Sequence, residues 1–263
     1  MVYRIKQLDR CRICALDGEI GHVRDVYFDD EQWVIRYLVV ETGNWLTGRK
    51  VLISPYGVAR VDFDERTVAV NLTRRQVAHS PDIDTEKPVG RQLELEYLEY
   101  YGYPTYWPYT TLWPWGSMPA ITPPATGTWQ QVRARDVSTQ TASRPPRHLP
   151  ASRPQRHLRS ANEVLRYHIR ATDDSIGHAE DALFDPRSWS IRFLVVDTRN
   201  WWPGKRVLVA PAWIDNVDWP ERSIAVAMTR DEIQRCPEYD PGHQPVAAAE
   251  QRRSDYPKPD QRH

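Results

Sequence analysis

Short stretches in which apolar and polar residues alternate occur in two parts of this chain. In the first part, Trp33, Ile35, Tyr37 and Val39 form an apolar set with a period of two. This period is typical of a half-buried strand, so we expect the set to face the core and Arg36 to face away from it. Further strands are predicted at about residues 22–28, 49–54, 58–63 and 67–72. The pattern indicates a mainly β protein.

The alternating pattern belongs to an internal duplication. A shift of 156 positions aligns residues 20–84 with residues 176–240 without a gap, and about 29 of the 65 pairs are identical. The copy of the apolar set consists of Trp189, Ile191, Phe193 and Val195. Arg192 stands in the copy where Arg36 stands in the first unit. The duplication predicts two units of one fold.

Turn and cap signals mark the ends of elements in each unit. Asp17-Gly18 separates two strand-like stretches, which is a strong hairpin signal. Each unit closes with a capping box, Thr73-Arg-Arg-Gln76 and Thr229-Arg-Asp-Glu232, and a proline follows soon after. A short helix is therefore expected at each site. Five or six short strands with one helical turn fit a small closed barrel, because closure removes exposed sheet edges.

The duplicated motifs resemble those of the PRC-barrel family. They are G-x-x-x-x-x-x-F-D after the hairpin, then W-x-I-R-Y-L-V-V, then N-W-x-x-G followed by two basic residues and Val-Leu. The resemblance covers roughly residues 4–84 and 160–240. The family includes the cytoplasmic domain of the photosynthetic reaction-centre H subunit, the C-terminal domain of a ribosome maturation factor, and bacterial proteins with two copies. It implies two small PRC-type β-barrels, each with a short C-terminal helix, packed as an intrachain pseudo-dimer.

Composition divides the chain into five parts. Twenty-two prolines beside twelve glycines indicate substantial non-globular sequence. We expect the first PRC-barrel repeat at residues 1–86, an aromatic and Pro-rich segment at 87–116, and a disordered basic linker at 117–160. The second repeat then covers residues 161–240, and a disordered tail covers 241–263.

The aromatic segment permits two interpretations. Its first part predicts a helix at Arg91–Tyr101, with Leu93, Tyr97 and Tyr101 on one face. The rings either form a strip that binds a partner, since Tyr and Trp dominate interface anchors, or cover an open face of a barrel. As a binding strip it would consist of Tyr103, Tyr106, Trp107, Trp113 and Trp115.

Charge and missing motifs narrow the function classes. The formal net charge is zero, so no overall field attracts nucleic acid or an anionic membrane. The basic linker either contacts phosphates or an anionic partner, or acts as a solvated spacer. The start of the chain has no apolar signal region, and its apolar runs are too short to span a bilayer, so we expect a cytoplasmic protein. We find no Walker loop, dinucleotide fingerprint, metalloprotease or serine-hydrolase motif. We therefore expect no enzyme and no cofactor.

Two further patterns bear on chemistry. Cys11 and Cys14 form a CxxC on a predicted strand, where residues three apart point to opposite faces, and no second pair completes a metal site. We expect structural thiols and no metal. His22 and His178 are the histidine pair present in both units, each three residues before an aspartate. Local hydrogen bonding is favoured over acid–base chemistry, although the reaction-centre resemblance implies proton handling.

The repeated Asn-Trp loop with its basic residues is the predicted partner-binding surface. A Trp beside paired cations can anchor a partner, and the alternative is that Trp plugs a barrel end. The residues are Asn44, Trp45, Arg49 and Lys50 in the first unit and Asn200, Trp201, Trp202, Lys205 and Arg206 in the second. We expect a non-enzymatic interaction module that binds a protein partner. The alternatives are an RNA- or ribosome-maturation-associated factor, contacting RNA through the basic linker, and a reaction-centre H-like role in photosynthetic electron or proton transfer.

Overall fold

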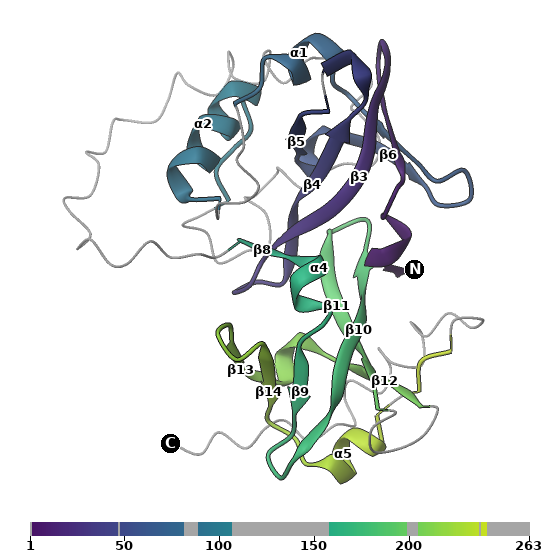
Figure 1. Ribbon diagram of the computed structural model, residues 1–263, viewed down its shortest axis with the longest axis vertical. Coiled ribbons are helices and arrows are strands. Elements are labelled where there is room, and N and C mark those ends of the chain that lie inside the picture. Colours follow the sequence, from purple (N-terminus) through teal and green to yellow (C-terminus); the bar gives the residue numbers. More distant parts are fainter. Residues whose placement is uncertain are drawn as a thin grey trace, which may run out of the picture.

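The fold of the described chain is mainly β (Figure 1). The computed structural model describes residues 2–46, 48–81, 89–106, 158–198, 205–236 and 238–240, without the side chains of residues 91 and 92. No helix in these ranges is long and apolar enough to cross a membrane. The predicted linker up to residue 157 and the predicted tail at 241–263 lie outside the described residues.

The elements of the first unit follow the predicted order. They are β1 (Tyr3–Arg4), η1 (Ile5–Gln7), β2 (Arg12–Ala15), β3 (Gly18–Asp29), β4 (Val34–Thr42), η2 (Asn44–Leu46), β5 (Lys50–Ile53), η3 (Pro55–Gly57), β6 (Val58–Asp62), β7 (Thr67–Val70), α1 (Arg74–Ala78) and α2 (Arg91–Tyr101). The Asp17-Gly18 hairpin, the helix after the first capping box and the helix at Arg91–Tyr101 are confirmed.

The second unit repeats this order. It contains β8 (Leu158–Ser160), α4 (Ala161–Val164), β9 (His168–Arg170), β10 (Ser175–Asp185), β11 (Ser190–Asp197), β12 (Arg206–Val209), η4 (Pro211–Trp213), β13 (Ile214–Asp218), β14 (Ser223–Val226) and α5 (Arg230–Gln234). The second capping box is confirmed, because the Thr229 hydroxyl accepts from the Glu232 amide and the Glu232 carboxylate accepts from the Thr229 amide.

The strands form one open sheet rather than two closed barrels. Its path runs β13-β14-β9-β10-β11-β4-β3-β2-β7-β6, while β1, β12, β5 and β8 pair beside it. The two units are continuous because β4 and β11 pair at Val34 and Ser190. The sheet is not closed among the described residues, so the prediction of closed barrels is not confirmed.

The two units exchange their N-terminal segments. Strand β1 leaves the first unit and pairs with β10, so that Tyr3 lies opposite Phe184. Strand β8 precedes the second unit and pairs with β3, so that Arg159 lies opposite Phe28. These pairs are related by the same shift of 156 positions as the sequence duplication. Figure 1 shows the N-terminus beside β10 and β8 beside β3.

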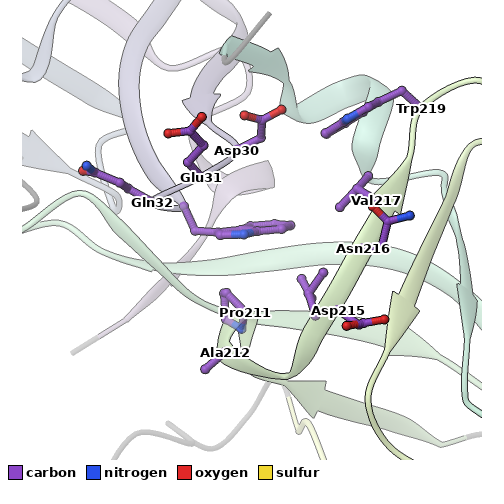
Figure 2. Close-up of a pocket in the computed structure, with 11 residues that line it drawn as sticks. Asp30, Glu31, Gln32, Pro211, Ala212, Asp215, Asn216, Val217 and Trp219 are labelled. Atoms are coloured by element: carbon purple, nitrogen blue, oxygen red, sulfur yellow. The ribbon is translucent and has the colours of Figure 1, made fainter. Parts of the chain in front are cut away.

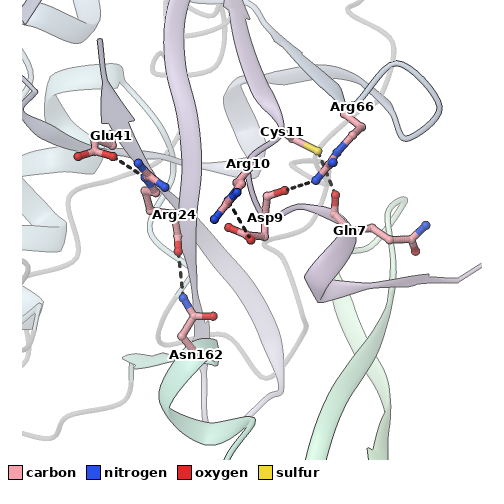
Figure 3. A network of polar contacts seen from close by, with 8 residues as sticks. All are labelled: Gln7, Asp9, Arg10, Cys11, Arg24, Glu41, Arg66 and Asn162. Atoms are coloured by element: carbon pink, nitrogen blue, oxygen red, sulfur yellow. Dashed lines mark hydrogen bonds and ion pairs between the residues drawn. The ribbon is translucent and has the colours of Figure 1, made fainter. Parts of the chain in front are cut away.

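Hydrogen bonds to aspartate side chains also connect the two units in a symmetric way. The amide of Asn162 donates to Asp25 at 3.2 Å, and the amide of Lys6 donates to Asp181 at 3.3 Å. The Asn162 side chain also donates to the carbonyl of Arg24 (Figure 3). At the centre of the junction the backbones of β4 and β11 bond reciprocally, from Ile35 to Trp189 and from Ile191 to Trp33. Equivalent residues of the two units thus make equivalent contacts, as expected for an approximate two-fold axis at the junction.

The boundary of the predicted linker needs a correction. Composition places residues 158–160 in the disordered basic linker, whereas they form β8. The strand forms because β3 offers it backbone partners and Arg159 pairs with Asp30 across the junction at 2.7 Å. A partner 129 residues away in the sequence cannot be read from local composition.

The predicted alternation along β4 and β11 was also wrong in part. In β11 the main core receives Ile191, Leu194 and Val196, whereas Val195 packs in a separate small cluster beside Phe193. The register of β11 against β10 shifts between Phe193 and Ile191, which leaves Arg192 as an extra, bulged residue. A bulge reverses the side-chain alternation beyond it.

The same bulge occurs in the first unit. The register of β4 against β3 passes from Tyr37 to Ile35, so Arg36 is the extra residue. Its side chain is only 1% exposed, contrary to the prediction that it faces away from the core. The guanidinium lies 3.9 Å from the ring centroid of Tyr106 and donates to Gln32. Strand β4 is therefore buried on both faces.

Helix α2 covers the outer face of the first unit through Tyr97. This ring packs edge-on against Tyr37, with centroids 5.2 Å apart. Its hydroxyl donates to the carbonyl of Leu52 at 3.0 Å and accepts from the amide of Ser54 at 3.1 Å. Burial raises the pKa of Tyr97 well above its ordinary value, so the hydroxyl stays protonated and can donate to the carbonyl of Leu52.

We expect Tyr97→Phe to lower the free energy of unfolding by about 1–3 kcal/mol, because two buried backbone groups lose a partner. Urea denaturation measures this value, and hydrogen exchange should show faster opening of α2. The control is Tyr100→Phe on the same helix, whose hydroxyl donates to the Gln76 carbonyl at an exposed site where water can replace it. Equal effects of the two substitutions would show that the buried hydrogen bonds of Tyr97 do not hold α2 on the first unit.

Candidate functional site

The predicted Asn-Trp loop of the first unit is anchored to its own fold. Asn44 is exposed and Trp45 is half-buried. The indole N–H of Trp45 donates to the carbonyl of Ile20 at 2.6 Å, and the Arg74 guanidinium lies 4.4 Å from its ring centroid. These contacts hold Trp45 against its own unit.

The basic residues of this loop have different environments. The guanidinium of Arg49 donates to the carbonyls of Ala78 at 2.9 Å and Ser80 at 2.6 Å. These carbonyls lie at the end of α1, where backbone acceptors lack helical partners. Lys50 is exposed on β5. Arg49 therefore has a structural role, whereas the role of Asn44 and Lys50 in partner binding stays a prediction.

The corresponding loop of the second unit is only partly described. Asn200, Trp201 and Trp202 lie outside the described residues. Lys205 lies 3.6 Å from Glu238, and Arg206 pairs with Glu180. The described contacts of this loop are thus within the second unit.

The two described tyrosines of the predicted binding strip are buried. Tyr103 is 7% exposed and Tyr106 is 2% exposed, whereas Trp107, Trp113 and Trp115 lie outside the described residues. The Tyr103 ring lies 5.3 Å from that of Tyr56. These two tyrosines follow the interpretation in which the rings cover a face of the first unit.

A buried polar network, which the sequence did not predict, lies beneath this segment. The carboxylate of Glu94 accepts from the hydroxyls of Tyr37 and Tyr106. Tyr106 stacks on Arg36, which lies 3.6 Å from Asp29. Burial lowers the pKa of Arg36 and raises that of Tyr37. The network pairs the Arg36 guanidinium with Asp29 and links α2, through Glu94, to Tyr37 of β4.

The cysteine and histidine candidates occupy local positions. The Cys11 thiol is buried and donates to the carbonyl of Gln7 at 3.0 Å, and burial raises its pKa (Figure 3). A thiol with a raised pKa is a weak nucleophile. His22 lies 4.0 Å from Glu19, and His178 lies 4.0 Å from Asp197. Within the described ranges no group of three or more metal-ligating side chains converges.

A cleft at the junction of the two units is a candidate site that joins residues from both units. Its volume is about 520 Å³. One wall is the turn between β3 and β4, residues 30–33, and the other is formed by η4, β13 and Trp219. Figure 2 shows Asp30 and Glu31 on the turn and Asp215 on the opposing wall. The walls of this cleft are about 180 positions apart in the sequence, so no local pattern predicts it.

One edge of the cleft already holds a cation. The Arg159 guanidinium lies 3.6 Å from the ring centroid of Trp219 and pairs with Asp30 at 2.7 Å. Trp219 also packs edge-on against Tyr167. Trp33 is nearly buried and is fixed by its backbone bond to Asp29 and by stacking on Phe28. The aromatic walls are thus held in place before any ligand arrives.

The two units differ at the wall that contains η4. In the first unit the equivalent residues, Pro55, Tyr56 and Gly57 of η3, are all buried. A Cβ atom on Gly57 would lie 2.9 Å from the Tyr103 hydroxyl, so the aromatic segment lies directly over η3. In η4, by contrast, no residue is buried. The duplication leaves the second copy of this surface open within the described structure.

Comparison with known proteins identifies one domain. The family described as the PRC-barrel domain matches residues 1–77, which include β1 to β7 and most of α1. No curated protein matches the chain. The tandem arrangement is not part of this match. A PRC-barrel domain is therefore present at residues 1–77 of this chain.

Proposed function

We propose that the chain is a non-catalytic interaction module in which two PRC-barrel units form an intrachain pseudo-dimer and bind a protein partner at their junction. The tandem arrangement is supported by the gapless duplication and by the repeated element order. The pseudo-dimer is supported by the exchange of β1 and β8, which gives each unit a strand from the other. A covalently joined pair of this kind presents a rigid surface to a partner.

The observation that carries the binding role is the open cleft between the units. Its volume of about 520 Å³ falls within the range of ligand-binding clefts, and its walls include two indole rings. Trp is enriched among the residues that dominate binding energy at protein interfaces. Since ring contacts hold Trp33 and Trp219 in place, binding requires little ordering of these two side chains.

The test is to block the cleft without disturbing its walls. Ala212 lines the cleft and is exposed, so Ala212→Arg places a bulky side chain in it at little cost to folding. The control is Gln234→Arg, which places the same side chain on the exposed surface of α5. We expect proteins that co-purify with the wild-type chain and with Gln234→Arg to be lost with Ala212→Arg. Recovery of the same proteins with all three chains would reject the cleft as the binding surface.

A further inference from the structure

We infer that the junction cleft recognises a guanidinium group, carried by an arginine side chain of the partner polypeptide. This inference rests on the proposed function, because it names the chemistry that the partner presents to the same cleft. It follows from the charge of the walls, their aromatic rings and a cation already bound within the protein at the cleft edge.

The charge of the lining is negative. Asp30, Glu31 and Asp215 line the cleft, and none of the described residues that line it is a lysine or arginine. Asp30 pairs with Arg159, which lies beside the cleft. Glu31 and Asp215 are both exposed, and neither carboxylate has a hydrogen bond or ion pair within the described residues. An entering cation would therefore meet two carboxylates that no other described side chain occupies.

Aromatic rings make the cleft suitable for a flat cation. Trp33 and Trp219 both contribute to the lining. Indole has the most favourable face for a cation among the aromatic side chains. A guanidinium is planar, stacks on such faces and donates through several N–H groups at once, whereas an ammonium is compact and strongly hydrated. Carboxylates beside indole rings thus favour arginine over lysine.

Arg159 shows that this chemistry operates at the cleft. Its guanidinium stacks on Trp219 at 3.6 Å while it pairs with Asp30 at 2.7 Å. The side chains of Arg159 and Asp30 are only 15% and 12% exposed, so the pair is largely shielded from solvent. The protein thereby uses one indole and one carboxylate to hold a guanidinium, and Trp33, Glu31 and Asp215 bring the same residue types to the lining of the cleft.

The position of β13 indicates a polypeptide rather than a free small molecule. This strand forms one wall of the cleft and lies at the end of the sheet path. In the described structure it pairs with β14 alone. An extended chain beside an edge strand can use backbone hydrogen bonds while its side chains enter neighbouring pockets.

Isothermal titration of the full chain with a blocked Gly-Arg-Gly-Arg-Gly peptide tests the inference. The same peptide with citrulline, which has the shape of arginine without its charge, is the ligand control. A third peptide has lysine in place of both arginines. We expect the citrulline peptide and this lysine peptide to bind at least about tenfold more weakly than the arginine peptide. We expect free arginine amide to bind about tenfold more weakly as well, because it lacks a backbone to lie along β13.

The protein variants locate the binding. The double substitution Glu31→Gln with Asp215→Asn should weaken arginine-peptide binding about tenfold. Asp64→Asn with Glu65→Gln, at an exposed turn outside the cleft, should leave it unchanged. Binding of the citrulline peptide as tight as that of the arginine peptide, or no binding of either, would overturn the inference, and equal binding of arginine amide would overturn its polypeptide part. Loss of partner capture with Ala212→Arg but not with the double substitution would overturn the inference alone and leave the proposed function standing.

Discussion

The substitution Gly21→Ala is expected to lower the free energy of unfolding by about 3 kcal/mol or more. Gly21 lies in β3 opposite Thr42 of β4. A Cβ atom at this position would overlap the carbonyl oxygen of Glu41 and lie 2.9 Å from Cα of Thr42. Both atoms belong to the backbone, so no rotation of a side chain relieves the overlap. The two strands would have to separate at this pair.

The duplication supplies an internal repeat of this experiment. A Cβ atom on Gly177 would overlap the carbonyl oxygen of Asp197 in the same way, so Gly177→Ala should have a similar effect. The control is Gly43→Ala, because a Cβ atom there would lie 3.9 Å from Trp45, at ordinary contact distance. Urea denaturation followed by circular dichroism compares the three. Similar stability of Gly21→Ala and Gly43→Ala would contradict the close backbone approach.

Features that depend on neighbouring residues could be predicted from the sequence. The Asp17-Gly18 hairpin and the two capping boxes are each complete within about four residues, so local chemistry determines them. The helix at Arg91–Tyr101 followed from spacing along one face. Gly21 and Gly177 occupy matching positions of the duplication, but only the structure shows why a glycine is needed there.

Features that depend on distant partners could not be predicted. The alternation of β4 implied that Arg36 faces away from the core, but a bulge at this residue changes the side-chain order. Bulges depend on the register between strands, which a pattern along one strand does not contain. The strand at residues 158–160 likewise exists because β3 pairs with it across the junction.

The candidate site also has features that local sequence predicts and features that depend on distant partners. The Trp-and-basic pattern of the Asn-Trp loop was visible in the sequence, but it does not reveal that Trp45 and Arg49 bond to backbone carbonyls of their own unit. The junction cleft joins residue 30 to residue 219, and no periodicity links such positions. Its best sequence signal was the duplication itself, which implied that the two units would meet.

The second large effect is expected at Asp25, where the two units exchange segments. Its carboxylate accepts from the amide of Val26 at 2.7 Å, the hydroxyl of Ser160 at 2.6 Å and the amide of Asn162 at 3.2 Å. Asp25→Ala leaves these donors without an acceptor, and we expect the free energy of unfolding to fall by about 2–4 kcal/mol. Hydrogen exchange should show that β8 and α4 open first. The exposed turn residue Asp64, changed to Ala, is the control.

Asp25→Asn separates the hydrogen bonds from the charge. Burial raises the pKa of Asp25 above its ordinary value of 3.8, so the folded state binds the proton more tightly than the unfolded state. The stabilisation from the protonated carboxyl is complete below the unfolded value and is lost as the pH rises through the folded value. Asparagine keeps an acceptor oxygen and has no charge, so Asp25→Asn should be less destabilising than Asp25→Ala at neutral pH. The difference in stability between wild type and Asp25→Asn, measured by urea denaturation, should shift in favour of Asp25→Asn as the pH rises from about 3.8. A difference that stays constant over this range would show that the carboxylate is not desolvated at the junction.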